Sequence, residues 1–205
     1  MANSAQQDPS LFPATSMPDR RWWATLWPDP AGVLQQIDIR AGMVALDLCC
    51  GDGYFTAPLA ELLDGRVYAL ELDAALIEQA RAEVARRGAG VRQWFCADAR
   101  QVAGLLPERV DYVLLANTFH GVPDQPSIAR AVRSVTRTGG CLGIVNWHRI
   151  PRERTMVLGL ARGPQSHMRM TPAQVAAIVE PAGFRTKAVV ELPPYHYGSV
   201  FEAVD

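Results

Sequence analysis

The sequence predicts an α/β fold in which helices cover both faces of an open seven-stranded sheet that is mostly parallel. After Gly42, apolar segments alternate regularly with segments of helical periodicity, as in proteins built from strand–helix–strand units. A glycine turn, Gly51-Asp52-Gly53, follows the first apolar run directly. Only about five residues separate the last two apolar runs, which permits a hairpin and therefore one antiparallel strand at the sheet's end.

Seven strands and four longer helices are expected along the chain, preceded by two short helices. One short helix carries Trp23 and Trp27 on one face, and the other covers residues 30–37. The strands are expected at 43–48, 66–71, 91–96, 109–115, 141–147, 185–191 and 197–204, and the longer helices at 54–63, 74–87, 124–136 and 172–182. Because parallel neighbours are joined by right-handed crossovers, the helices are divided between the two faces of the sheet.

Two of these helices have clear signals at their ends. Asp73 is expected to cap the helix over 74–87 at its N-terminus, and Gly88 to end it. In the last helix, Thr171 is the expected N-cap and Gln174 completes a capping box, while Gly183 stops the helix.

The length of 205 residues, of which 49% are hydrophobic, suits one compact domain. Residues 1–18 are expected to be a flexible N-terminal segment, and residues 19–205 a single domain. Within it, 19–40 would form a helical lid over the site. Residues 148–170 contain five arginines, one glutamate and several glycines and prolines, and are expected to be a loop that covers the substrate.

The composition disfavours several classes of function. A formal net charge of −1 gives no overall field for nucleic acid or anionic lipid. The four cysteines lack the spacing of a metal site and are expected to be reduced and mostly buried, so no metal is expected. Neither a secretion signal nor a run of roughly 18 apolar residues is visible, so we expect a cytoplasmic protein without a membrane partner. The oligomeric state stays open, a homodimer included.

Polar residues stand at the ends of four successive strands, where an open parallel sheet binds its ligand. The first strand delivers Asp47 and the glycine turn, and the second ends in Glu71. The third is followed by Asp98 and the fourth by Asn117. Since burying an unpaired carboxylate is expensive, three acids at one edge indicate a ligand site rather than a core.

The pattern Asp47-x-Cys49-x-Gly51-x-Gly53 resembles the first motif of class I methyltransferases, Rossmann-like enzymes that use S-adenosylmethionine. The resemblance implies that Glu71 grips the ribose hydroxyls and Asp98 the adenine amino group. Cys49 departs from the pattern, because the family has a glycine there. The implied cofactor-binding residues are Asp47, Cys49, Gly51, Gly53, Glu71, Leu72, Ala97, Asp98 and Asn117.

Two other functions compete with a small-molecule methyltransferase. A nicotinamide-dependent oxidoreductase would also place an acid such as Glu71 about twenty residues after the glycines, but Thr56 stands where its third glycine belongs. A non-catalytic protein of the same fold could bind S-adenosylmethionine without turnover, since no sharp catalytic motif is present.

The acceptor side is expected after the fourth and fifth strands. The segment beginning Asn117-Thr118-Phe119-His120 resembles the Asn-x-x-His segment of small-molecule methyltransferases, and His120 and His148 are the candidate general bases. As substrate residues we expect Arg149 and Arg152, whose guanidinium groups suit an anionic acceptor, with Tyr195 and His196. Each of these predictions has a competing interpretation. His120 could be a structural hydrogen-bonding histidine, the arginines could lie in a solvated surface loop, and Tyr195 and His196 could belong to a packed turn. A carbon, oxygen or sulfur acceptor remains open.

Overall fold

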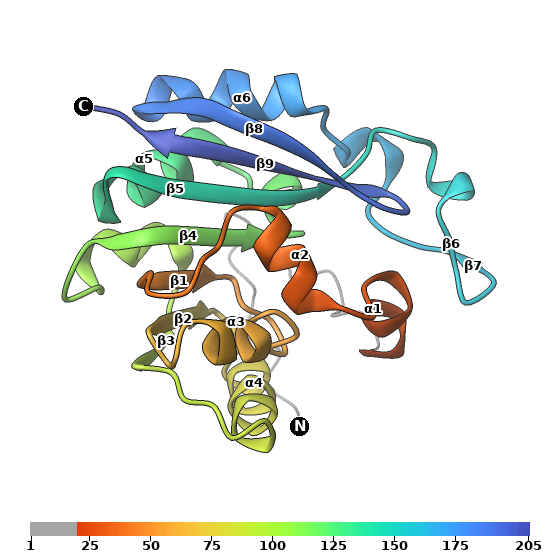
Figure 1. Cartoon of the computed structure of the whole chain (residues 1–205). Coiled ribbons are helices and arrows are strands. Elements are labelled where there is room, and N and C mark those ends of the chain that lie inside the picture. Colours follow the sequence, from red (N-terminus) through yellow and green to blue (C-terminus); the bar gives the residue numbers. More distant parts are fainter. Residues whose placement is uncertain (1–19) are drawn as a thin grey trace, which may run out of the picture.

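The computed structural model describes residues 20–205, which form one α/β unit around a seven-stranded sheet (Figure 1). The predicted fold class is confirmed, and the strands lie in the order β3-β2-β1-β4-β5-β9-β8. Their bounds are β1 Ala45–Leu48, β2 Val67–Glu71, β3 Gln93–Cys96, β4 Val110–Ala116, β5 Thr136–Trp147, β8 Phe184–Leu192 and β9 His196–Ala203. The expected N-terminal segment 1–18 lies outside the described residues.

One antiparallel strand is present, as predicted, and it is the last strand in the chain, but its position in the sheet differs from the expectation. Strands β1 to β5 pair in parallel, whereas β9 pairs antiparallel with both β5 and β8. The expectation placed this strand at the end of the sheet; it lies one strand inside, and β8 forms the edge. The crossover through the last α-helix leaves a gap beside β5, which the short hairpin lets β9 fill.

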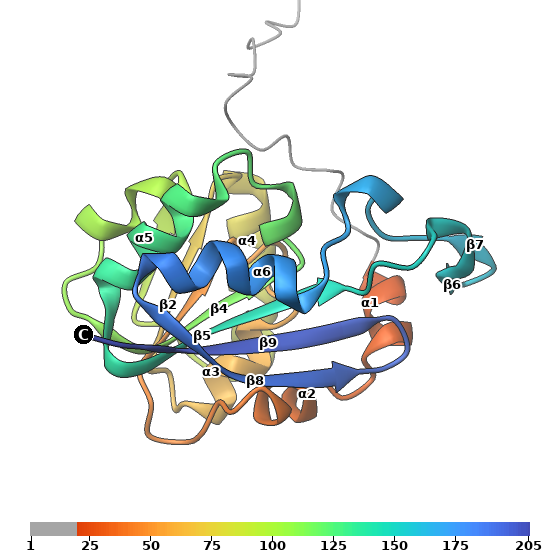
Figure 2. The same ribbon diagram turned by 90° about the horizontal axis from the view of Figure 1, so that it is seen from above.

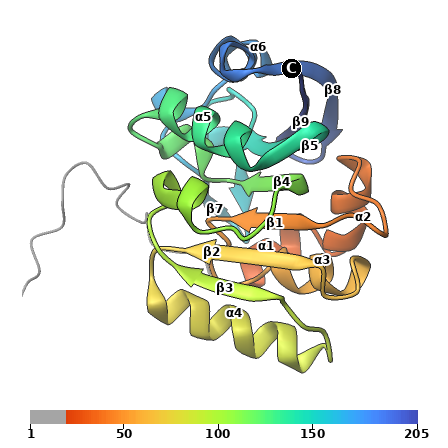
Figure 3. The ribbon, with the colours of Figure 1, turned by 90° about the vertical axis from the view of Figure 1, so that its left-hand side faces the viewer.

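Helices cover both faces of the sheet (Figure 3). One apolar core joins the sheet to the first four α-helices, and a second core joins it to the last two. The helices are α1 Arg20–Leu26, α2 Pro30–Gln36, α3 Thr56–Leu62, α4 Ala74–Arg86, α5 Gln125–Val135 and α6 Pro172–Val179. Short 3-10 helices cover η1 Ala99–Gly104, η2 Phe119–Gly121, η3 Arg152–Arg154, η4 Ser166–Met168 and η5 Glu180–Ala182.

The predicted N-terminal caps are confirmed, whereas α6 ends at Val179 and the 3-10 turn η5 continues from there to Gly183. The Asp73 side chain accepts a hydrogen bond from the Ala75 N–H, and Thr171 and Gln174 form both halves of the capping box. Gly183 follows η5 with φ +97°, a left-handed conformation that favours glycine. None of the helices within residues 20–205 combines the length and apolar character needed to cross a membrane.

Residues 148–170, expected to be a loop, contain a small hairpin and are held by a buried arginine. Strands β6 Met156–Val157 and β7 Leu160–Ala161 pair antiparallel. Arg169 is only 2% exposed and donates hydrogen bonds to the carbonyls of Pro164, Ile150 and Arg162 and to Thr155 Oγ1. These bonds join distant parts of the segment, so that one guanidinium group determines its shape.

Replacing Arg169 should therefore loosen this segment. In Arg169→Ala, four acceptors lose a donor, and we expect backbone amides of 148–170 to exchange hydrogen at least about tenfold faster. Hydrogen exchange followed by mass spectrometry checks this. The matched control is Arg154→Ala, an exposed arginine of the same segment. Equal exchange rates in both variants would contradict the assigned role.

Candidate active site

The carboxyl ends of the parallel strands meet at the edge of the sheet that faces α1 (Figure 1). The register places Asp47 beside Ala69 and Glu71 beside Cys96, so that β1, β2 and β3 end side by side. The Gly51 N–H donates to Glu71 Oε2 at 3.0 Å, which connects the glycine turn directly to the end of β2. The structure thus brings together the carboxylates that the sequence singles out.

The turn after β1 contains three residues in the left-handed region. Cys49, Gly51 and Gly53 have φ of +61°, +56° and +81°. A Cβ at Gly53 would lie 2.7 Å from Ala80 Cα in α4, so the close approach of turn and helix requires glycine there. Cys49, which stands where the family pattern has a glycine, lies in the left-handed region at a cost of order 1 kcal/mol.

Glu71 and Asp98 each organise the backbone beside them. Glu71 Oε1 accepts the N–H groups of Leu72 and Asp73, while Oε2 accepts that of Gly51. Asp98 caps η1 by accepting the Arg100 N–H at 2.8 Å, and it also pairs with the Arg100 guanidinium. This side-chain bond lowers the pKa of Asp98 and keeps it ionised. Both carboxylates therefore have fixed orientations at the edge.

Asp47 is buried, with 2% of its surface exposed, and its Oδ2 accepts a hydrogen bond from Thr56 Oγ1 at 2.6 Å. Burial, reinforced by the charge of Glu71 and opposed by the Thr56 bond, raises the pKa of Asp47 to about 7. Burial also raises the pKa of the Cys49 and Cys50 thiols, so neither is a thiolate at neutral pH.

The N-terminal helix α1 lies against this turn through groups that the sequence analysis missed. Arg20 forms ion pairs with Glu83 at 2.7 Å and with Asp52 at 3.5 Å, and its guanidinium lies over the Tyr54 ring. The Tyr54 hydroxyl donates to the Trp27 carbonyl at 2.6 Å. The sequence offered one signal for the Arg20 contact: Asp52 and Tyr54 in the glycine turn are an acid and an aromatic residue, both of which can bind a guanidinium group.

The tryptophans of the expected lid form a packed stack. Trp23 stacks on Trp22 at 5.1 Å and on Trp27 at 5.4 Å between ring centroids. Trp23 and Trp27 are buried, and Trp22 is half-buried with its ring 6.1 Å from that of Trp147. The stack therefore joins the glycine turn to the end of β5.

On the β4 and β5 side, the structure brings Asn117, His120 and Asn146 to the same edge. Asn117 has φ +58°, and its buried Oδ1 has no hydrogen-bond partner among residues 20–205. His120 Nδ1 lies 3.4 Å from Oδ1 of the fully buried Asn146. Burial lowers the pKa of His120 although the Asn146 bond opposes this, so the ring is neutral at pH 7. Sequence reasoning missed Asn146, whose only signal was its position beside Trp147 at the end of β5.

The other predicted acceptor residues are less free than the sequence suggests. His148 Nε2 pairs with Glu191 at 2.8 Å on the edge strand. The Tyr195 hydroxyl donates to the Met156 carbonyl at 3.1 Å. Arg149 is exposed, and Arg152 Nε donates to the Gly163 carbonyl at 3.0 Å.

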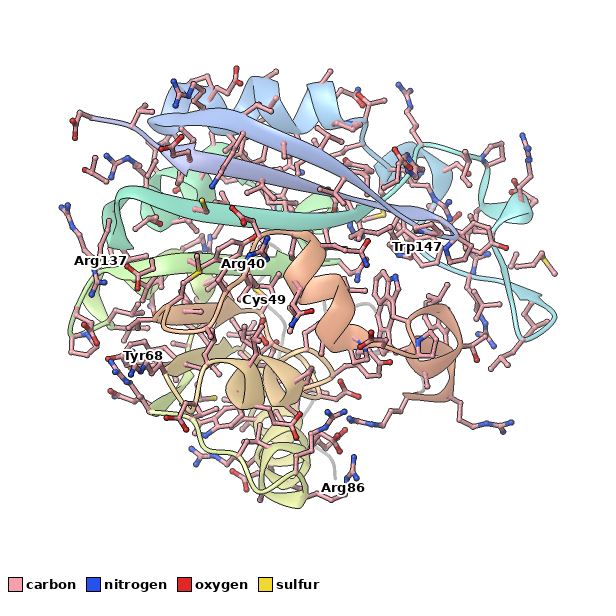
Figure 4. All side chains as sticks on the ribbon, in the orientation of Figure 1. Arg40, Cys49, Tyr68, Arg86, Arg137 and Trp147 are labelled. Atoms are coloured by element: carbon pink, nitrogen blue, oxygen red, sulfur yellow. The ribbon has the colours of Figure 1, made fainter. Side chains whose placement is uncertain are left out.

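His196 is fully buried between two indole rings, with centroids 4.4 Å from Trp27 and 4.1 Å from Trp147. Neither ring nitrogen has a hydrogen-bond partner within the described residues. Burial, with the nearby charge of His148, lowers the pKa of His196 well below its ordinary value, so this imidazole is neutral. Trp147 is labelled in Figure 4 at the end of the sheet, next to residues 148–170.

Comparison with known proteins adds family evidence to this geometry. Residues 45–140 match a family model described as a methyltransferase domain. The chain is 29% identical over 111 residues to a demethylmenaquinone methyltransferase of Geobacillus stearothermophilus, covering 53% of this chain and 47% of that protein. It is 29% identical over 161 residues to a trans-aconitate 2-methyltransferase of Methylobacterium radiotolerans, covering 75% of this chain and 59% of that protein. The chain thus spans about half to three-fifths of the length of these relatives.

The fold also matches solved structures. A SAM-dependent methyltransferase from Aquifex aeolicus superposes with a TM-score of 0.73 over 91% of this chain and 94% of that one. At 23% sequence identity this likeness concerns the fold.

The buried acid makes a testable contribution to stability. Because the folded state holds the Asp47 proton up to about pH 7 and the unfolded state releases it near 3.8, the stability contribution of Asp47 is full below pH 3.8 and is lost as pH rises to about 7. Asp47→Asn should remove this loss and be more stable than the parent at pH 8, by at most about 4 kcal/mol. Urea unfolding between pH 4 and 8 measures the difference.

The control for this prediction is Asp64→Asn, an exposed acid in a left-handed turn that asparagine also accepts. It should follow the pH profile of the parent. A parallel profile for Asp47→Asn and the parent would contradict the raised pKa.

Proposed function

We propose that this chain, whose residues 45–140 match the methyltransferase-domain family model and which has the class I fold, transfers a methyl group from S-adenosylmethionine to a small-molecule acceptor. One observation carries the proposal. The carboxylates of Asp47, Glu71 and Asp98 surround a left-handed glycine turn, with a neutral histidine across the same edge of the sheet.

The described residues fit the cofactor. Glu71 and Asp98 are oriented acceptors at the ends of β2 and β3, suited to ribose hydroxyls and to the adenine amino group. Between them in sequence, Leu72 is 45% exposed, an apolar side chain that a purine ring would cover. The unpartnered Oδ1 of Asn117 provides a further acceptor at the end of β4. Asp47, Cys49, Gly51, Gly53 and Ala97 would complete the cofactor site.

When bound, S-adenosylmethionine supplies an electrophilic methyl group on a sulfonium. The chain must then align the acceptor, exclude water and, for a protic acceptor, remove a proton. With Nδ1–H donating to Asn146 Oδ1, His120 keeps a free lone pair on Nε2, and its lowered pKa keeps that lone pair available at neutral pH. We therefore assign His120 as the general base and Asn146 as its positioning residue.

For the acceptor we propose a small molecule with an anionic group. The half-buried Trp22 ring lies beside the buried Trp147 ring at this edge, and the Arg162 and Arg169 guanidiniums lie over these two rings at 5.7 and 5.1 Å. Arg162 Nε is buried without a hydrogen-bond partner among residues 20–205, whereas Arg169 is committed to the 148–170 segment. Arg162 is therefore the arginine we favour for the anionic group. The names of the relatives mention demethylmenaquinone and trans-aconitate, both small molecules.

The other residues predicted to contact the acceptor would need to change their present contacts or would have a packing role. To bind the acceptor, Arg149 would have to turn from solvent towards the site, and Arg152 would have to break its hydrogen bond to the Gly163 carbonyl. His148 would have to leave Glu191 to act as a base. Tyr195 and His196 would act by packing their rings against Trp147 rather than by donating protons.

Cofactor binding should depend on the two edge carboxylates. In isothermal titration, S-adenosylmethionine and S-adenosylhomocysteine should bind saturably, and Glu71→Ala or Asp98→Ala should weaken both by about tenfold or more, because each removes a hydrogen bond to a charged acceptor. Glu78→Ala, an exposed acid of α4, is the matched control and should bind as the parent does. Binding of NAD alone would instead support an oxidoreductase.

The base should appear in the pH profile of turnover. With an acceptor found by screening, kcat/KM should stay level below the ordinary histidine pKa of about 6.5 and fall only at lower pH, since the neutral ring is the active form. His120→Gln should lower kcat by about a hundredfold or more. Asn146→Ala should move the acidic limb to still lower pH, because the Asn146 bond raises the pKa of His120.

The control for the base is His167→Gln, which changes an exposed histidine in η4. Full activity in His120→Gln would remove His120 from the mechanism. Cofactor binding without turnover on any acceptor would favour the non-catalytic alternative.

A further inference from the structure

The β6–β7 hairpin presents apolar side chains to solvent. Met156, Leu158 and Leu160 are 48%, 50% and 56% exposed, and they are three of the five exposed large hydrophobic residues within residues 20–205. Figure 2 shows β6 and β7 standing out from the end of the sheet, beyond α1. The apolar tip therefore lies at an extremity of the described structure.

The tip also has an unfavourable backbone conformation for its sequence. Leu158 and Gly159 form the two-residue turn with φ of +51° and +77°, values that such hairpins usually assign to asparagine followed by glycine. A leucine in the left-handed region costs about 1 kcal/mol or more. An exposed leucine that destabilises its own turn is better explained by a contact made outside this chain than by folding.

The base of the hairpin is anchored by packing and hydrogen bonds. Val157 is 2% exposed and packs into the core, and the Tyr195 hydroxyl donates to the Met156 carbonyl. Below the strands, Thr155 Oγ1 donates to the Arg162 carbonyl at 2.7 Å and receives a hydrogen bond from Arg169. The hairpin is therefore held outward by its anchored base.

Basic residues surround this base. Arg149, Arg152, Arg154 and Arg162 flank the hairpin in sequence, with Glu153 as the only acid between residues 148 and 170. Arg149 and Arg154 are exposed and have no ion pair among residues 20–205. The net charge of −1, which gives no overall field for anionic lipid, hides this local excess of positive charge.

We propose that the β6–β7 hairpin docks this protein on an anionic lipid surface, with Met156, Leu158 and Leu160 inserted among the lipids and the exposed Arg149 and Arg154 at the headgroups. An apolar tip with a basic collar matches both layers of such a surface. The proposal is independent of methyl transfer, because it concerns only where the chain binds.

Vesicle co-sedimentation of the full chain tests the proposal. The parent should bind phosphatidylcholine vesicles that contain phosphatidylglycerol, more strongly than pure phosphatidylcholine, and less strongly at high salt. Leu158→Asn should weaken binding about tenfold. Its thermal unfolding temperature should stay equal or rise, because asparagine tolerates the left-handed turn. Val189→Asn, an equally exposed apolar residue on β8, should leave binding unchanged.

The electrostatic part has its own pair of variants. Arg149→Gln/Arg154→Gln should weaken binding by about fivefold for each arginine removed. Arg109→Gln/Arg130→Gln, which changes two exposed arginines elsewhere, should not weaken it comparably. The proposal is overturned if the parent ignores anionic vesicles, if the control variants lose binding equally, or if Leu158→Asn lowers the unfolding temperature, which would make Leu158 a structural residue.

Discussion

The left-handed turn between β1 and α3 is the constraint on which the rest of the edge depends. Gly53 lets the turn approach α4 to a distance that no side chain permits, and the Gly51 N–H bonds to Glu71 at the end of β2. Together these contacts align the ends of the first two strands and leave Asp47 buried beneath the turn. The altered ionisation of Asp47 is a consequence of that geometry rather than of its neighbours in sequence.

Above the turn, the structure concentrates polar groups that lack partners. Within residues 20–205, the indole nitrogens of Trp22, Trp23 and Trp27, both ring nitrogens of His196, and side-chain atoms of Asn117, Asn146, Ser199 and Arg162 are buried without a hydrogen bond. A buried polar group that stays without any partner costs about 1–3 kcal/mol. Most belong to α1 or to the ends of β4 and β5 and the segments that follow them. Such a cluster of unpartnered polar groups is expected at a binding site, where the folded state is less stable than it could be because these groups are kept for a ligand.

Positive charge has two different uses in residues 148–170. Arg169 is buried, and its charge is compensated by carbonyl oxygens and the Trp147 ring, so it acts as a structural crosslink. Arg149 and Arg154 face solvent, where charge is available to a partner. The sequence shows only that all of these residues are arginines of one segment. Burial separates the two roles.

Local signals were enough for the fold class, the helix caps, the glycine turn and the three edge carboxylates, because each depends on residue type and spacing within one element. The place of β9 inside the sheet, the contact of Arg20 with Glu83, the pairing of His120 with Asn146 and the burial of Arg169 were not readable in this way. These features join residues far apart in the chain or depend on which surface packs against which, and such contacts leave no period in the sequence. The β6–β7 hairpin escaped prediction for a different reason: its strands are two residues long, and Leu158-Gly159 lacks the residues that usually mark such a turn.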